Sequence, residues 1–147
     1  MEERSKARFR ATRERIGLSQ KALADMLGNT VDIVKKWENP RYVAPPEDAW
    51  RLLDRMLDAH RKAVDAAVSI IHERAKEHDG RQPEEVRLLY WRSQAQYNAY
   101  GRDLGDYTVI DARAREVAVR LEMEGIRVTF QYPEDDEQTF QTLANTR

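Results

Sequence analysis

The chain has 147 residues, of which 25 are basic and 26 acidic, so its formal net charge is −1. It contains no cysteine, which excludes disulfides, thiol nucleophiles and cysteine-ligated zinc. No apolar run approaches the roughly 18 residues that a membrane span needs, and the first residues lack the apolar stretch of a signal peptide. We therefore expect a cytoplasmic protein that does not associate with membranes.

The near-neutral total conceals an uneven distribution of charge. Residues 1–42 contain ten basic and six acidic side chains, a net charge of +4, which leaves −5 for the rest of the chain. A basic N-terminal region predicts an anionic partner at that end of the chain. The alternative is ordinary helix surface covered by water, and charge alone does not decide between the two.

Three short helices are predicted in this basic region, at about residues 3–16, 20–27 and 31–39. Ser19 and Thr30 precede the second and third helices and are expected to cap them. Gly17 and the pair Gly28-Asn29 separate the helices, and Pro40 prevents the third from continuing. The side chains expected to face inward from the second and third helices are Leu23, Ala24, Leu27, Val34 and Trp37.

A long helix is predicted next, over residues 46–78, after a short linker that contains Pro45. Its apolar positions recur every three or four residues, beginning at Trp50 and Leu53 and ending at Ile71. About 32 helical residues extend close to 48 Å. This pattern is compatible with a coiled-coil seam or with a core helix shared by the head and the remainder of the chain.

The last third of the chain predicts a β-α-α-β module. Strands are expected over residues 86–92 and 126–132, because apolar side chains alternate there. Ser93 is expected to cap a short helix, and Asp111 to cap a second one that ends at Gly125. The predicted fold is therefore mainly α with a small α+β C-terminal module: a head (1–45), a connecting helix (46–78), the module (79–133) and a mobile acidic tail (134–147).

The head contains a motif with several fixed points, Ser19-Gln20-Lys21-Ala22-Leu23-Ala24, Leu27-Gly28, Val34 and Trp37-Glu38. This motif resembles the xenobiotic-response-element class of helix-turn-helix, the Cro and C1 repressor type, over about residues 8–57. Asn29 and Pro40 depart from the class pattern, at places where an apolar residue and a glycine are usual. The resemblance implies that the third helix enters a major groove, which is about 12 Å wide.

The resemblance also implies which side chains meet DNA. The second helix would present its N-terminus to a phosphate. On the third helix, the lysines could donate to guanine, Val31 could touch a thymine methyl group, and Asp32 could accept from a cytosine amine. The candidate DNA-binding residues are Ser19, Gln20, Lys21, Thr30, Val31, Asp32, Lys35, Lys36, Arg41 and Tyr42.

The plan of the whole chain is loosely similar to the YdiL-like proteins and the anti-CRISPR-associated autorepressors, through Arg87-Leu88-Leu89-Tyr90 and Tyr107-Thr108-Val109-Ile110-Asp111. That resemblance implies a homodimer on an inverted-repeat operator that represses its own operon. Two strands alone are marginally stable, and pairing across a two-fold axis could make a four-stranded sheet. The candidate dimerisation residues are Tyr90, Trp91, Tyr97, Tyr107, Val128 and Phe130.

Other functions stay open at this stage. The C-terminal half could neutralise a small protein partner, as an antitoxin does, with Phe140 and Leu143 as apolar contacts in the tail. Alternatively, Arg87, Tyr90, Trp91 and Arg92 could stack single-stranded RNA bases.

An enzyme is not expected. The three histidines, His60, His72 and His78, lack the spacing of a helical metal site, and we find no glycine-rich phosphate loop and no serine-nucleophile motif. We expect no metal and no cofactor. The sequence therefore predicts a DNA-binding transcriptional repressor. The resemblance alone implies an origin in a phage or mobile element.

Overall fold

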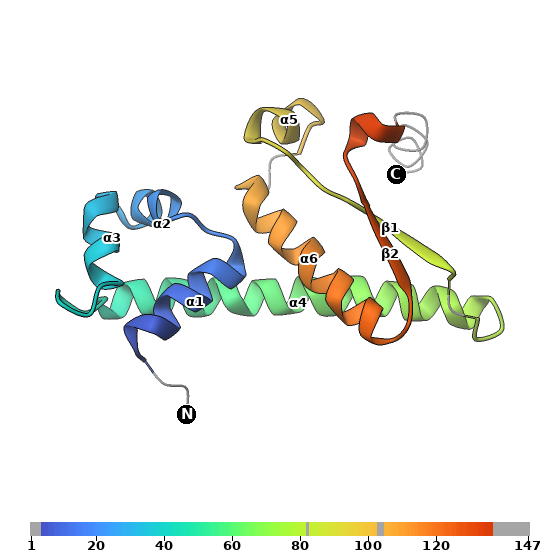
Figure 1. Cartoon of the computed structure of the whole chain (residues 1–147), viewed down its shortest axis with the longest axis horizontal. Coiled ribbons are helices and arrows are strands. Elements are labelled where there is room, and N and C mark those ends of the chain that lie inside the picture. Colours follow the sequence, from blue (N-terminus) through green and yellow to red (C-terminus); the bar gives the residue numbers. More distant parts are fainter. Residues whose placement is uncertain (1–3, 82, 103–104, 137–147) are drawn as a thin grey trace. The chain divides into compact units, whose positions relative to one another are not determined.

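The computed structural model describes residues 4–81, 83–102 and 105–136. In this part of the chain, helices dominate, and one small sheet lies in the C-terminal part (Figure 1). The chain divides into two compact units between Lys62 and Ala63, inside the long helix. The predicted class, mainly α with a small α+β C-terminal module, is confirmed.

The three short helices of the N-terminal unit are confirmed as α1 (Lys6–Ile16), α2 (Gln20–Leu27) and α3 (Val31–Trp37). The helix α1 begins later than predicted, because Ser5 caps it and accepts the Arg8 N–H at 3.0 Å. Ser19 and Thr30 cap α2 and α3 as predicted, accepting N–H groups at 3.0 Å and 3.4 Å. Each cap satisfies one of the N–H groups that a helix start leaves unpaired.

The core of the N-terminal unit is built around Phe9. Its ring meets Trp37 of α3 and Trp50 edge to face, at centroid distances of 6.2 Å and 5.1 Å. Leu23 and Val34 are fully buried, so the inward faces predicted for α2 and α3 are correct. Edge-to-face aromatic pairs add about 0.5–1.5 kcal/mol each to what the buried area contributes.

The long helix is confirmed as α4 (Glu47–Glu77), and its apolar face is buried within both units. Trp50, Leu53 and Leu57 are buried in the N-terminal unit. Val64 and Val68 belong to the core of the C-terminal unit, together with residues of its strands and of α6 (Tyr107–Met123). The two alternatives for this apolar pattern were a coiled-coil seam and a core helix. In the described residues, α4 is a core helix.

The sheet of the C-terminal unit consists of β1 (Glu85–Leu89) and β2 (Arg127–Gln131), which pair in parallel (Figure 1). Val86 lies opposite Val128, and Leu88 opposite Phe130. Parallel strands need a crossover connection of a dozen or more residues, and α5 (Gln94–Ala99) and α6 supply it. Ser93 caps α5 as predicted.

One predicted helix boundary in this unit is wrong. The last helix does not begin after Asp111: α6 begins at Tyr107, with Asp106 as its N-cap. Thr108, Val109 and Ile110 are β-branched, and such residues have a low intrinsic preference for helix. Burial of Val109 and packing of Ile110 beside the Trp91–Tyr97 cluster outweigh this intrinsic preference. Asp111 consequently lies inside the helix, where its carboxylate accepts the backbone N–H of Trp91 at 2.9 Å.

The strands and the start of the acidic tail also differ from expectation. Both strands are shorter than predicted, and the chain after β2 forms the 3₁₀ turn η1 (Pro133–Asp136). Pro133 is buried and Glu134 bonds to Arg92 and Gln96, so the start of the predicted tail packs against the unit. Phe140 and Leu143 lie outside the described residues.

Candidate nucleic-acid interface

Two glycine turns set the directions of α2 and α3. Gly17 ends α1 with a φ of 93°, and Gly28 ends α2 with a φ of 66°, in the left-handed region that favours glycine. Asn29, which departs from the class pattern, is exposed and donates its N–H to Ala24 at 2.9 Å. The turn after α2 is therefore closed by its backbone and does not need an apolar side chain at position 29.

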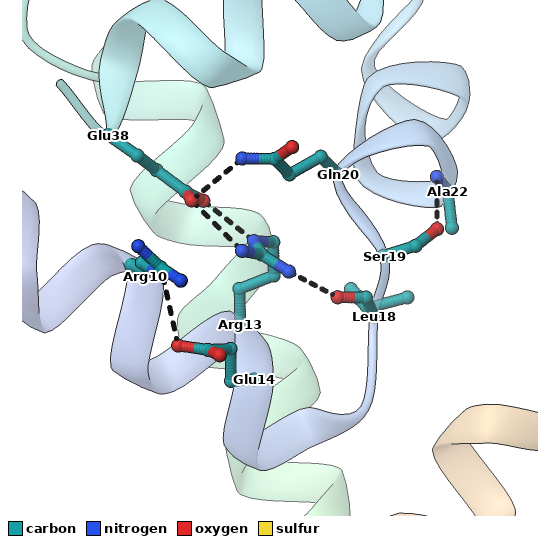
Figure 2. A network of polar contacts seen from close by, with 8 residues as sticks. All are labelled: Arg10, Arg13, Glu14, Leu18, Ser19, Gln20, Ala22 and Glu38. Atoms are coloured by element: carbon teal, nitrogen blue, oxygen red, sulfur yellow. Dashed lines mark hydrogen bonds and ion pairs between the residues drawn. The ribbon is translucent and has the colours of Figure 1, made fainter.

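A buried ion pair joins α1 to the end of α3 (Figure 2). Arg13 donates from Nε and Nη2 to the Glu38 carboxylate at 2.6 Å and 2.9 Å, and from Nη1 to the carbonyl of Leu18 at 2.8 Å. The side chains of Arg13 and Glu38 are only 9% and 4% exposed. Two parallel N–H···O bonds fix direction as well as distance, so this pair sets the position of the α3 terminus against α1.

Gln20 extends the same network to α2. Its Nε2 donates to Glu38 at 3.1 Å, so the first residue of α2 lies beside the residue that follows α3 (Figure 2). The N-terminus of α2 and the exposed face of α3 are thereby held together by Glu38. Arg10 and Glu14 pair beside them on exposed α1 surface at 3.2 Å, an interaction of the kind that contributes about 0–1 kcal/mol.

All ten candidate DNA-binding residues lie on α2, on α3 or in the turns beside them, and none of them is buried. Gln20 and Lys36 are half-buried. The members exposed on the surface are Ser19, Lys21, Thr30, Val31, Asp32, Lys35, Arg41 and Tyr42.

Some candidates already have partners within the chain. The Lys21 ammonium lies 2.9 Å from the Asp25 carboxylate, in an exposed pair along α2. The Lys36 ammonium lies over the ring of Tyr42, 5.8 Å from its centroid. That contact joins a candidate on α3 to one in the turn that follows. This turn is shaped by Pro40 and by a backbone bond of 3.1 Å from the Tyr42 N–H to the Asn39 carbonyl.

The residues that hold this surface in place are not among the candidates predicted from the sequence. From the sequence, Arg13 and Lys6 contribute only to the basic charge of residues 1–42, and Glu38 only to the acidic charge and to the motif. The half-buried Lys6 donates to the carbonyls of Lys36 and Val43 at 3.1 Å and 2.6 Å. No local pattern announces such bonds, because their partners lie 25 to 37 residues away.

The candidate dimerisation residues fall into two groups. Trp91 and Tyr97 are 4% and 1% exposed and pack edge to face in a small cluster of their own unit. Tyr107 packs against that cluster, and Val128 against the larger core. Tyr90 is half-buried, with its hydroxyl bonded to Arg115, and Phe130 is 44% exposed. Trp91 is thus enclosed and cannot present its ring to an RNA base in this conformation.

Two further properties concern only the described part of the chain. Its helices include none long and apolar enough to cross a membrane. Within the same residues, no three side chains of His, Asp or Glu gather in a group that could hold a metal ion.

The geometry of α2 and α3 defines a helix-turn-helix, and comparison with known families agrees. Residues 9–56 match the family model described as Helix-turn-helix. This segment is thus similar to Cro/C1-type helix-turn-helix domains, which supports a general role in DNA-binding transcription regulation. The search of curated proteins gave no significant match.

Proposed function

We propose that this chain is a sequence-specific DNA-binding repressor whose helix α3 reads the major groove. The observation that carries the proposal is the Arg13–Glu38–Gln20 network, which holds the start of α2 beside the end of α3. A rigid frame of this kind lets phosphate contacts and base contacts be made together. The basic residue Lys35 is exposed on the surface of α3, whose end this network holds in place.

The side chains of α3 suit different base edges. Lys35 or Lys36 can donate to guanine O6 and N7, and Val31, 37% exposed, can contact a thymine methyl group. Asp32 repels phosphate, so its use in the groove would be to accept from a cytosine amine. Ser19, Gln20 and Lys21 are proposed phosphate contacts, as are Arg41 and Tyr42 on the other side of α3.

We further propose that the protein acts as a homodimer on an inverted repeat. Helix-turn-helix proteins gain affinity by occupying two half-sites about one helical turn apart. The described residues of the C-terminal unit form a sheet of two strands, so each strand has one edge that no further strand pairs with, and Phe130 in β2 and Tyr132 just after it are 44% and 40% exposed. An exposed strand edge is a template for pairing with another chain.

We place this activity in the cytoplasm. The test is binding to DNA from the region upstream of the protein's own coding sequence. A labelled duplex with the inverted repeat should bind the full chain far more tightly than a scrambled duplex of equal composition. The logarithm of the affinity should fall with the logarithm of salt concentration, with a slope of about −0.9 for each phosphate contact. Autoregulation predicts that added protein lowers transcription from that upstream DNA.

Each outcome has a defined meaning. Equal affinity for the scrambled duplex would refute sequence specificity, and a monomer at micromolar concentration would refute the dimer. Tighter binding to single-stranded RNA, or stable co-purification with a small protein, would support the alternatives considered from the sequence.

A further inference from the structure

Lys6 donates hydrogen bonds to two backbone carbonyls in different segments of the chain. Its ammonium donates to the carbonyl of Lys36 in the last turn of α3 and to the carbonyl of Val43 in the linker to α4. The last carbonyls of a helix have no partner within the helix, and a lysine there also complements the helix dipole. The Lys36 carbonyl also accepts the Asn39 N–H at 3.1 Å, so Lys6 adds a second bond there and, through its bond to Val43, ties the end of α3 to the linker.

These two carbonyls lie on either side of a candidate reading contact. Lys36 has its carbonyl bonded to Lys6 and its ammonium over Tyr42, and Tyr42 directly precedes Val43. Displacement of either carbonyl would move the Lys36 side chain or the ring that supports it. Lys6 is the one side chain of the described residues for which bonds to both carbonyls are seen.

Arg4 reinforces the same segment. Its guanidinium bonds to Glu47 in the first turn of α4 at 2.5 Å and 3.2 Å and lies 5.5 Å from the centroid of the Trp50 ring. The bond from Arg4 holds the pKa of Glu47 below its ordinary value. Arg4 and Lys6 both precede residue 9, where the match to the helix-turn-helix family begins.

We infer that Lys6 is a positioning residue for DNA recognition: it orients Lys36 by fixing the end of α3 and the linker, without touching DNA itself. This inference rests on the proposed function, because it takes α3 to be the reading helix. It assigns a recognition role to a segment outside the matched motif.

The first test is a double-mutant cycle on the specific duplex. Lys6→Met keeps the length of the side chain and removes its donors, and should weaken specific binding about fivefold, the equivalent of a hydrogen bond worth about 1 kcal/mol. If Lys6 acts through Lys36, the same change should cost little in a Lys36→Met background. A loss of equal size in both backgrounds would overturn the inference.

Salt dependence separates positioning from contact with phosphate. Removing a lysine that binds phosphate lowers the salt slope by about 1, whereas removing a positioning lysine leaves the slope unchanged. A slope that falls by one in Lys6→Met would overturn the inference. The control is Lys62→Met, which removes the same charge from an exposed pair with Asp58 on α4 and should leave affinity unchanged.

The second test requires no DNA, so its outcome does not depend on whether the proposed function is correct. In Lys6→Met, hydrogen exchange should become several-fold faster at the amides of Asn39, Arg41 and Tyr42, which close the turn after α3. Exchange at the amides of α2 should stay as in the wild type. Unchanged exchange in the turn would overturn the inference even if the wild type binds DNA, while a wild type that binds no duplex would refute the proposed function.

Discussion

The two units of this chain bury charged groups in opposite ways. The N-terminal unit buries an acid together with a base, because Glu38 accepts two bonds from Arg13. The C-terminal unit buries Asp111, 4% exposed, with a backbone N–H as its bonded partner. Burial raises the pKa of Asp111 to about 6, and the bond from Trp91 offsets only part of this effect.

The N-terminal unit is therefore rigid at its buried ion pair, whereas the stability of the C-terminal unit responds to pH. A buried, doubly bonded ion pair is costly to break, which suits a surface that must hold reading side chains at fixed positions. A buried carboxylate with an elevated pKa makes the stability of its unit depend on pH.

The largest effect is expected from breaking the buried pair. Glu38→Gln leaves the Arg13 guanidinium buried without its counter-charge, and should lower the free energy of unfolding of the N-terminal unit by about 3–5 kcal/mol. Chemical denaturation followed by tryptophan fluorescence measures this loss, because Trp37 and Trp50 lie in that unit.

The matched control is Glu14→Gln, which removes the same charge from the exposed pair with Arg10. We expect a change of about 0–1 kcal/mol there. Equal losses in the two variants would mean that burial of the Arg13–Glu38 pair has no energetic consequence.

The second effect is a dependence of stability on pH in the C-terminal unit. The folded state of Asp111 binds its proton more tightly than the unfolded state, whose ordinary pKa is 3.8. Its contribution to stability is therefore fully present below pH 4 and is lost as the pH rises toward 6. Asp111→Asn removes this ionisation, so the stability of the variant relative to the wild type should increase by about 2–3 kcal/mol between pH 4 and pH 8.

Denaturation curves of both proteins at several pH values measure this difference. Glu122→Gln removes a carboxylate from the exposed surface of the same helix and should display little of it. A pH-independent difference between Asp111→Asn and the wild type would contradict the elevated pKa.

The same contrast explains what could be predicted from sequence. In the head, side-chain spacing predicted all three helices, two caps and the inward residues, because each depends on neighbours within a few positions. The Arg13–Glu38 pair could not be predicted, since its partners are 25 residues apart. In the module, Trp91 and Phe130 looked alike as aromatic interface candidates, yet the fold encloses the first and leaves the second 44% exposed. Tyr97 and Tyr100 enclose Trp91, and the alternation of apolar residues along the chain does not predict those contacts.

The third prediction uses that exposed residue to test association. If the dimer forms through the C-terminal unit, Phe130→Ser should weaken self-association about tenfold to a hundredfold, because a partly exposed aromatic ring beside an open strand edge would be central to the interface. Sedimentation equilibrium measures the change. Met123→Ser is the control, since Met123 is 83% exposed at the end of α6 and lies in neither strand. Equal effects of both substitutions would place the interface elsewhere.

The smallest effect compares the same kind of cap in the two units. Ser19 accepts the Ala22 N–H at 3.0 Å on an exposed surface, and Ser93 accepts the Gln96 N–H at 3.1 Å where the bond is partly buried. Substitution by alanine should cost about 1 kcal/mol at Ser19, and somewhat more at Ser93, since water reaches its freed N–H group less easily. Ser69→Ala, at an exposed position inside α4, is the control and should be neutral or slightly stabilising, because alanine is the better helix former.

If Ser19→Ala also weakens specific DNA binding beyond its loss of stability, while Ser93→Ala does not, then Ser19 has a role on DNA in addition to its role as a cap.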